Sequence, residues 1–363
     1  MTRIAVIPGD GIGVEVTREA VLALRAAAEV GGRPIAFDML PYGADHFLKT
    51  GETLPDSALE ELRGHDAVLL GALGDPRVPD NRHAADILLG IRFRLDLYVN
   101  QRPVKLLADH LTPLKGRTVR DIDFVVFREN TEGLYVGMGG IFKKGTPDEI
   151  AVQEDINTRK GVERIIRHAF EHARQRGKTR VLMSDKSNAL TFGHDLWQRT
   201  FRQVASEYPG IETSHMYVDA LAMQLVKDPS PFEVIVTCNM FGDILSDLGA
   251  QIQGGLGLAA SANLHPGRTG LFEPVHGSAP KYAGQNVANP VGAILSSAML
   301  LEEVGRADEA RLVEDAVSGA VRDGQTTRDL GGSLGTREVG EEICRRIRGA
   351  RQAPVRVFGR PGA

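Results

Sequence analysis

A short apolar run followed by two evenly spaced aspartates constrains the fold of this chain more than any other stretch. Residues 234–236 are β-branched, as buried strands often are, and Asn239 and Gly242 lie where a turn is expected. A helix that begins near Gly242 places Asp243 and Asp247 on one face, because they are four residues apart. The stretch therefore predicts a strand, a turn and a helix that carries two neighbouring carboxylates.

The paired carboxylates have two interpretations on spacing alone. Two like charges side by side cost energy unless a cation or strong donors lie between them, so the pair is a candidate Mg²⁺ or Mn²⁺ site with hard oxygen ligands. The alternative is one aspartate that favours the helix N-terminus, beside a second that is solvated. Ile244, Leu248 and Ile252 repeat at the same spacing, and we expect their face of the helix to be buried.

Strand-like and helical runs alternate along the chain. Strands are expected at 3–8, 67–72, 124–127 and 180–183, and helices at 14–30, 56–63, 161–176 and 291–304. This alternation predicts an α/β fold with a sheet that is at least partly parallel. A chain of 363 residues is long enough for about two domains.

Composition and charge disfavour several classes of protein. The 43 Lys+Arg against 47 Asp+Glu give a net charge of -4, which provides no reason to expect nucleic acid or an anionic membrane as a partner. The N-terminus lacks a signal-peptide pattern and no run approaches membrane-spanning length, so we expect a cytoplasmic enzyme. Cys238 and Cys344 are too few for a zinc cluster or a disulfide framework, and we expect Cys238 to be a buried structural thiol. Residues 345–363 are rich in Arg, Pro and Gly, which predicts a loosely held tail.

Charged residues and a glycine loop lie near the ends of predicted strands. Arg92, Arg102 and Arg128 are suited to carboxylates because the guanidinium fork bonds both oxygens, although each alone also fits a surface salt bridge. Lys186 lies just past a strand, where catalytic groups often occur in α/β sheets, and a solvated lysine is the plain alternative. The loop 9–13 can present backbone N–H groups to an anion or can simply form a tight turn.

Six motifs occur together in the order found in one family. They are 9–13 (GDGIG), 100–103 (NQRP), 128–135 (RENTEGLY), 185–188 (DKSN), 239–247 (NMFGDILSD) and 273–280 (EPVHGSAP). Over residues 2 to 347 the chain resembles the isocitrate/isopropylmalate dehydrogenase family, which comprises metal-dependent β-decarboxylating dehydrogenases. It is most similar to the isopropylmalate branch and to the tartrate/D-malate branch.

The resemblance implies an α/β fold of two domains with the active-site cleft between them. Residues 1–98 and 255–363 would form the cofactor-binding domain, and residues 99–254 the domain for substrate, metal and dimerisation. A homodimer with shared active sites, or a higher oligomer, is the implied assembly.

The resemblance also implies the roles of individual residues. Arg92, Arg102 and Arg128 would bind a small 2-hydroxy di- or tricarboxylate. Asp243 and Asp247, with the partner subunit's Asp219, would hold Mg²⁺ or Mn²⁺. The partner subunit's Lys186 would assist loss of the hydroxyl proton, and Tyr135 would protonate C3 after CO₂ leaves. The cofactor, NAD or NADP, would be bound by Gly11, Ile12, Glu273, His276, Gly277, Ser278, Ala279, Lys281, Tyr282, Asn289 and Arg328.

The predicted substrate depends on the helix before Arg92. Leu88 and Leu89 resemble the apolar wall of isopropylmalate enzymes, where each buried methylene of the substrate contributes about 0.8 kcal/mol. Ala85 departs from that pattern, and both the loop 139–146 and the Asn-Thr-Glu-Gly sequence at 130–133 resemble the tartrate/D-malate branch. We expect 3-isopropylmalate to be converted to 4-methyl-2-oxopentanoate and CO₂, the leucine-biosynthesis reaction of this family. The alternatives are tartrate or D-malate, isocitrate or homoisocitrate, and a regulatory subunit without activity.

Charge near the adenosine site bears on the cofactor. Lys281 and Tyr282 follow the motif HGSAP where NAD-dependent members carry an acidic residue, and Arg328 adds positive charge, whereas Ala288 is the residue typical of NAD-dependent members. A cation in place of a carboxylate favours a 2′-phosphate, so we expect NADP to be accepted.

Overall fold

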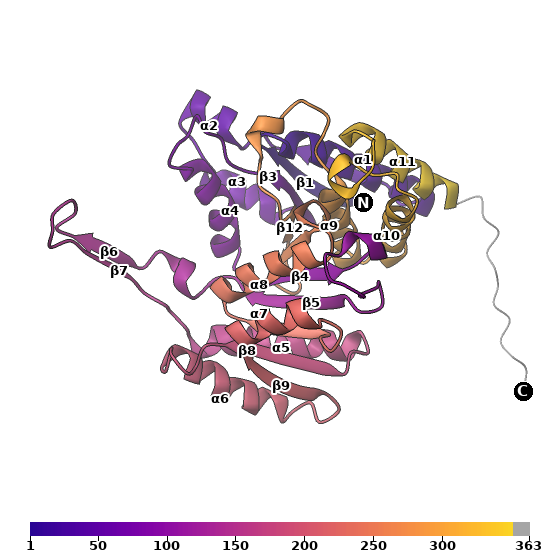
Figure 1. Cartoon of the computed structure of the whole chain (residues 1–363). Helices are drawn as coiled ribbons and strands as arrows, with labels where there is room; N and C mark the ends of the chain where they lie inside the picture. The colour runs from indigo at the N-terminus through magenta and orange to yellow at the C-terminus, as the bar shows by residue number, and fades with distance from the viewer. Residues whose placement is uncertain (351–363) are drawn as a thin grey trace, which may run out of the picture.

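The structure, a computed structural model, describes residues 1–350 and contains one large sheet (Figure 1). The ten strands lie in the order β2-β1-β3-β12-β11-β4-β5-β10-β8-β9. In chain order they are β1 (Thr2–Gly9), β2 (Ile35–Met39), β3 (Ala67–Ala72), β4 (Val99–Lys105), β5 (Asp123–Glu129), β8 (Arg180–Asp185), β9 (Glu212–Tyr217), β10 (Val234–Thr237), β11 (Ala260–Leu264) and β12 (Gly270–Pro274). The predicted α/β fold is confirmed.

The sheet is parallel at its two ends and antiparallel in its middle. β2, β1, β3 and β12 pair in parallel, as do β5, β10, β8 and β9. β11 pairs antiparallel with both β12 and β4, and β4 pairs antiparallel with β5. The first half of the sheet, up to β11, and the second half, from β4 onward, meet at the β11–β4 seam. We propose that these halves are the two domains expected from the sequence.

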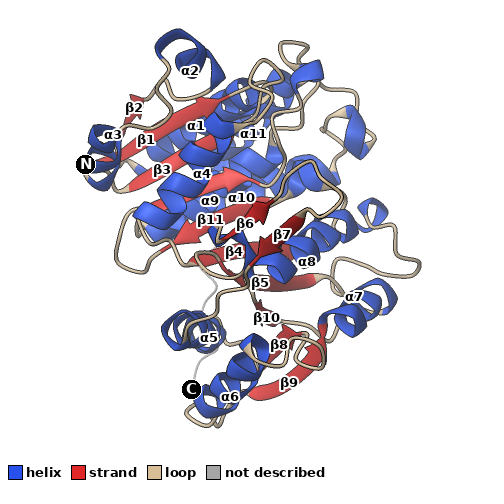
Figure 2. Ribbon diagram, turned by 90° about the vertical axis from the view of Figure 1, so that its left-hand side faces the viewer, coloured by secondary structure: helices blue, strands red, loops and turns tan. Residues whose placement is uncertain are grey.

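One face of the sheet is covered by helices from both halves (Figure 2). A single hydrophobic cluster runs beneath them, with side chains such as Phe127, Trp197 and Leu301. The helices are α1 (Gly13–Gly31), α5 (Arg159–Gln175), α6 (Gly193–Ala205), α9 (Val291–Glu303), α10 (Ala307–Arg322) and α11 (Thr336–Ala350). This core extends continuously across the seam.

On the opposite face the core is divided into two clusters. α3 (Asp56–Arg63) and α4 (Arg82–Arg94) bury one cluster on the first half, and α7 (Val218–Lys227) and α8 (Asn239–Ile252) bury another on the second. α2 (Ala44–Thr50) contacts α4. The short 3₁₀ helices are η1 (Asp109–Leu111), η2 (Leu134–Val136), η3 (Leu256–Leu258), η4 (Pro280–Tyr282) and η5 (Arg328–Leu330). The division between the clusters leaves room for a polar site.

Six polar side chains occupy the central strands between these two clusters. Alternate residues of a strand point to the same face, so Arg102 shares the face of Val104, and Arg128 shares the face of Val126. None of the six is more than 7% exposed. We call this set the polar floor: Asn100, Arg102, Arg128, Ser261, Asn263 and Glu273.

A two-stranded arm projects from the body of the molecule (Figure 1). It consists of β6 (Gly139–Phe142) and β7 (Ile150–Gln153), and every residue of both strands is exposed. Its apolar side chains Ile141, Phe142, Ile150 and Val152 are 51% to 62% exposed. An isolated hairpin is at best marginally stable in water, so an apolar arm of this kind fits a surface that a partner covers.

Several local predictions for the helix after β10 were wrong. α8 begins at Asn239 rather than near Gly242, because Cys238 is the last extended residue and caps the helix. Asn239 and Gly242 therefore lie inside the helix and form no turn. Ile244 is 56% exposed, because α8 buries Phe241 and Leu245 instead, whereas Ile252 is buried and Leu248 packs against the core as expected.

Two further predictions concerned the cysteines and the C-terminal end of the chain. Cys238 and Cys344 are buried and free, and burial raises the pKa of the Cys238 thiol to about 12, which confirms a structural thiol. Residues 345–350 belong to α11 and not to a tail, whereas residues 351–363 lie outside the described residues. None of the helices within residues 1–350 combines the length and the apolar character needed to cross a bilayer.

Candidate active site

A cavity of about 480 Å³ lies over the polar floor and is lined by residues of α4, α8 and the ends of β3 and β12. The carboxyl ends of parallel strands are the usual place for ligands in α/β sheets. Ten of the predicted site residues line this cavity: Leu88, Leu89, Arg92, Arg102, Arg128, Tyr135, Asp243, Glu273, His276 and Gly277.

Three buried arginines make this cavity suited to an anion. Burial and the neighbouring Arg102 lower the pKa of Arg128 to about 10, and burial also lowers the pKa of Arg102. A pKa near 10 leaves Arg128 charged at neutral pH. Nε of Arg92 is buried and has no hydrogen-bond partner among the described residues, so this donor is available to a bound carboxylate.

The two aspartates of α8 lie beside these arginines. Asp243 accepts a hydrogen bond from Nη1 of Arg128, and Oδ1 of Asp247 lies 3.7 Å from Nη1 of Arg102. Burial raises the pKa of Asp247, although the positive charge of Arg102 partly offsets this effect. Part of the cost of holding two carboxylates together is thus offset by cationic neighbours.

Tyr135 lies beside Asp243 and Arg128 over the second half of the sheet. Its hydroxyl donates to Oδ2 of Asp243 at 3.1 Å, and the guanidinium of Arg128 lies 5.5 Å from the centre of its ring. Burial, together with the nearby charge of Asp243, raises the pKa of Tyr135. The phenol therefore remains a proton donor throughout the neutral range.

Lys186 and Asp219 lie apart from this cavity within one chain. Nζ of Lys186 donates to Oδ1 of Asp219 at 2.6 Å, and the backbone N–H of Lys186 donates to Nδ1 of His194 at 2.9 Å. Among residues 1–350, no three His, Cys, Asp or Glu side chains come close enough together to hold a metal ion. Asp219 therefore does not join Asp243 and Asp247 within a single chain.

The donor atoms that are present fit a hard divalent cation. Asp243 and Asp247 offer only carboxylate oxygens, which Mg²⁺ and Mn²⁺ prefer. Both come from one turn of α8, so they can supply only part of an octahedral coordination sphere.

Two of the loops that carry predicted cofactor residues touch each other. The N–H of Ile12 donates to the carbonyl of Ser278 at 2.8 Å, and a Cβ on Gly11 would lie 2.1 Å from that oxygen. His276 has a buried Nε2 without a partner among the described residues, and a Cβ on Gly277 would point into open space. An unpaired polar atom beside free space fits a ligand.

The remaining predicted cofactor residues differ in their exposure. Ala279 is left-handed, with φ of 37°, and Asn289 is buried and donates to Oδ2 of Asp329 at 3.0 Å. Lys281 and Tyr282 of η4 are exposed, and Nζ of Lys281 lies 4.6 Å from the ring centre of Tyr282. Arg328 of η5 is also exposed.

Glu273, predicted to contact the cofactor, has its carboxylate engaged elsewhere. Oε1 accepts from Nη2 of Arg92 at 2.6 Å and from Nδ2 of Asn263 at 2.9 Å. Sequence reasoning missed Asn263, Ser261 and the side chain of Asn100, although Asn100 opens the NQRP motif. A polar residue at an inward position of a predicted strand is the signal that could have identified them.

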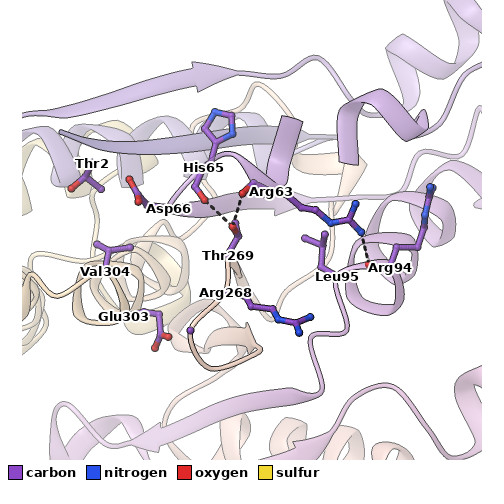
Figure 3. Close-up of a pocket in the computed structure, with 11 residues that line it drawn as sticks. Thr2, Arg63, His65, Asp66, Arg94, Leu95, Arg268, Thr269, Glu303 and Val304 are labelled. Atoms are coloured by element: carbon purple, nitrogen blue, oxygen red, sulfur yellow. Dashed lines mark hydrogen bonds between the residues drawn. The ribbon is translucent and has the colours of Figure 1, made fainter. Parts of the chain in front are cut away.

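A larger cavity, of about 770 Å³, lies on the opposite edge of the sheet (Figure 3). Thr2, Asp66 and Thr269 line it at the amino ends of β1, β3 and β12, together with Arg63, Arg94 and Arg268. Its position opposite the carboxyl ends, and the absence of the predicted site residues from its walls, separate it from the candidate active site.

The fold and the site together define a metal-dependent dehydrogenase of hydroxy acids. The chain belongs to the isocitrate/isopropylmalate dehydrogenase family, whose model matches residues 3–343. It is 47% identical to the 3-isopropylmalate dehydrogenase of Thermobifida fusca over 347 residues, covering 95% of this chain and 97% of that protein. It is 48% identical to the 3-isopropylmalate dehydrogenase of Frankia casuarinae over 353 residues, covering 96% of this chain and 100% of that protein. The structure superposes on isocitrate dehydrogenase from Methylococcus capsulatus with a TM-score of 0.87 and 39% identity, over 96% of this chain and 100% of that one.

Proposed function

We propose that this chain catalyses the NAD(P)-dependent oxidative decarboxylation of 3-isopropylmalate to 4-methyl-2-oxopentanoate and CO₂. One observation carries this proposal: the apolar side chains of Leu88 and Leu89 line the same cavity as Arg92, Arg102 and Arg128. A malate-type substrate with a branched alkyl group needs that combination of cations and apolar wall. The names of relatives 47% and 48% identical to the chain support the same substrate.

The proposed reaction uses the residues of the cavity in sequence. The arginines bind the carboxylates and orient C2 and C3 of the substrate. C2 would lose a hydride, for which a bound nicotinamide would be the acceptor, while its hydroxyl would lose a proton. The C3 carboxylate would then leave as CO₂, with its bonding electrons remaining on C3. The phenol of Tyr135 delivers a proton to C3. A divalent cation at Asp243 and Asp247 would polarise the C2 oxygen.

Lys186, the base expected to assist loss of the hydroxyl proton, does not line the cavity of its own chain. Lys186 and Asp219 lie outside the cavity residues, so we assign them to the site of a second subunit within a homodimer. The exposed apolar arm and the exposed Ile244 of α8 support such an assembly. The chain's own Asp243 and Asp247 would be completed by the partner subunit's Asp219.

The tartrate/D-malate alternative rested on the loop 139–146 and on the Asn-Thr-Glu-Gly sequence at 130–133. In the structure this loop includes β6 of the exposed arm and contributes no residue to the cavity. Leu88 and Leu89 line the cavity instead, together with Ala85, the residue that departs from the isopropylmalate pattern. The resemblance of the loop therefore carries little weight for the substrate, and the apolar wall decides for isopropylmalate.

The cofactor is NAD or NADP, and acceptance of NADP remains our expectation. Lys281 and Arg328 have no ion-pair partner among the described residues, so both cations are available to a 2′-phosphate. The cytoplasm as the location, and a small molecule rather than nucleic acid or membrane as the partner, also remain predictions.

A single assay series tests the proposal. Purified protein with Mg²⁺ or Mn²⁺ and either dinucleotide is offered 3-isopropylmalate, D-malate, tartrate and isocitrate in turn, and reduced nicotinamide is followed by absorbance. We expect the highest kcat/KM with 3-isopropylmalate. A higher value with D-malate or tartrate would move the assignment to that branch, and no reduction with any substrate would favour the regulatory subunit.

A further inference from the structure

Asn263 on β11 is the centre of a hydrogen-bonded chain through the polar floor. Its Nδ2 donates to Oε1 of Glu273 at 2.9 Å and to the carbonyl of Leu271 at 3.2 Å. Its Oδ1 accepts from Nδ2 of Asn100 and from Nδ2 of Asn130, both at 3.0 Å. The side chain is fully buried, and both donors and both acceptor positions of the amide are used.

The two arms of this chain end on two of the arginines. On one side, Glu273 receives Nη2 of Arg92 at 2.6 Å on the same oxygen that Asn263 contacts. On the other side, Oδ1 of Asn100 accepts from Nε of Arg102 at 3.0 Å. Asn100 is further fixed by Oγ of Ser261, to which its Nδ2 donates at 2.9 Å.

The hydrogen bonds of this network can all form in only one arrangement of the amide groups. A carboxylate only accepts, so Asn263 must present its NH₂ group to Glu273 and its oxygen to Asn100. Asn100 must then present its NH₂ group to Asn263, which leaves its oxygen for Arg102, a residue that only donates. The amide orientations of Asn263 and Asn100 are therefore dictated by their neighbours. A buried amide that uses all its donors and acceptors, as Asn263 does, is held rigidly, whereas Oδ1 of Asn130 has no partner among the described residues.

This hydrogen-bonded network also crosses the seam between the two halves of the sheet. Asn263 and Asn100 are directly paired in the β11–β4 register. Arg92 is carried by α4 in the first half, whereas Arg102 is carried by β4 in the second. We propose that Asn263 is a positioning residue that couples Arg92 to Arg102 and so sets the spacing of the two guanidiniums that hold the substrate. The inference rests on the proposed function, because it assigns both arginines to one substrate.

The variant Asn263→Asp should break the link from Asn263 to Glu273 and Arg92 while it keeps the link to Asn100. It keeps an oxygen for Asn100 and Asn130 but replaces the donor to Glu273 by a second carboxylate, which repels it. Arg92 should then leave its position, because Glu273 no longer has its second anchor. A misplacement of about 1 Å at a substrate-positioning group can reduce the rate on the order of 10²-fold.

Asn130→Asp is the matched control. Asn130 is also buried, donates to the same Oδ1 of Asn263 and otherwise reaches only the carbonyl of Leu97, at 2.9 Å. It is equally a buried amide in the network, but it leads to no arginine. If Asn263 were merely structural, the two variants would behave alike.

The experiment compares both variants with wild type. For Asn263→Asp we expect the KM for 3-isopropylmalate to rise at least tenfold, while the KM for the dinucleotide stays within twofold. For Asn130→Asp we expect both KM values to stay within twofold of wild type, even if its Tm falls as much as that of Asn263→Asp. An unchanged substrate KM in Asn263→Asp, or the same rise in both variants, would overturn the proposal.

A crystal structure of Asn263→Asp separates this inference from the proposed function. We expect the contact of Arg92 with Glu273 to be lost, and a retained contact would overturn the coupling even if wild type proves inactive on every substrate. Should Asn263→Asp fail to fold, Asn100→Asp interrupts the chain one link further along, since it keeps the acceptor for Arg102 and loses the donor to Asn263. The same rise in substrate KM is expected there, and an unchanged KM counts against the proposal.

Discussion

A Cβ on Gly242 would lie 2.5 Å from Cβ of Arg128, closer than two such atoms can approach. Glycine at this position lets α8 pack against β5 and holds Asp243 beside Arg128. We expect Gly242→Ala to push α8 outward, to lower the free energy of unfolding by about 1–3 kcal/mol and to weaken activation by Mg²⁺ at least tenfold. Urea unfolding and a Mg²⁺ titration of activity measure these effects.

Gly90→Ala is the control for this substitution. Gly90 lies within α4, and a Cβ there would meet no atom within 4 Å. Alanine in an open helical position should raise the free energy of unfolding by about 0.5–1 kcal/mol. An unchanged Mg²⁺ titration in Gly242→Ala would show that the close approach of α8 does not position the carboxylates.

The hydroxyl of Tyr135 is expected to act in proton transfer and not in metal binding. Tyr135→Phe should lower kcat by about 10²–10⁴-fold, because no other donor at this position would protonate C3. Affinity for Mn²⁺, measured by calorimetry, should stay close to wild type. Tyr208→Phe is the control, since the hydroxyl of Tyr208 also donates to a carboxylate, that of Glu171, at 2.7 Å but outside the cavity. Equal kinetics in wild type and Tyr135→Phe would remove Tyr135 from the mechanism.

The histidines of α5 predict a loss of stability in acid. Burial lowers the pKa of His168 from 6.5 to about 4. The unfolded chain therefore binds a proton below pH 6.5 that the native chain does not bind, and the free energy of unfolding falls as pH drops. At pH 5 this residue should reduce the free energy of unfolding by up to about 2 kcal/mol relative to pH 7. Unfolding in denaturant at both pH values measures the difference.

His168→Gln should lose less stability than wild type over this interval. The exposed His110 provides the control, and His110→Gln should follow the wild-type curve. His172, one turn further along α5, also has its pKa lowered to about 4, chiefly by burial, so part of the acid sensitivity should remain. Parallel curves for wild type and His168→Gln would contradict the assignment.

Cofactor choice should respond to the charge at position 281. Lys281→Asp places a carboxylate where we expect the 2′-phosphate, so the ratio of kcat/KM for NADP to that for NAD should fall at least about 100-fold, which corresponds to roughly 2.7 kcal/mol. The exposed Lys115, outside the site, provides the charge-matched control Lys115→Asp. A wild-type kcat/KM for NAD that is a hundredfold above that for NADP would already refute the electrostatic argument.

The arm predicts the state of association. A charge on Phe142, which is 62% exposed within one chain, should disfavour burial against a second copy. We expect Phe142→Asp to shift the protein toward monomers in light scattering and to lose activity in proportion, because Lys186 and Asp219 are assigned to the neighbouring site. Leu48→Asp, at an exposed apolar position of α2, should leave mass and activity unchanged. A fully active monomer would contradict the shared site.

The predictions from sequence succeeded where the signal was local. The helix 56–63 and the strand 67–72 match α3 and β3 residue by residue, because periodicity and apolar runs act over a few positions. The motifs NQRP and RENTEGLY located Arg102 and Arg128, the family resemblance added Arg92, and the structure brings all three into one cavity. Convergence itself could not be predicted, since it depends on strand order.

The predictions failed where a distant contact outweighs a local preference. Gly242 was expected in a turn, yet its role is the contact with Arg128. The hydrogen bond between Asn100 and Asn263 joins residues 163 positions apart, and an amide on a strand carries no sign of which distant amide it meets. Ile244 belongs to a helical repeat that predicts burial, but one chain leaves it exposed.

The late position of β11 and β12 in the sequence also determines the order in which the two halves of the sheet can be completed during synthesis. β1, β2 and β3 leave the ribosome first, but β12 and β11, which complete their half of the sheet, emerge only after all of residues 99–254. The ends of that intervening segment return to facing positions, with Val99 opposite Leu264. The second half can therefore form while the first half still waits for its last strands, and the first-made part of the chain is the last to close.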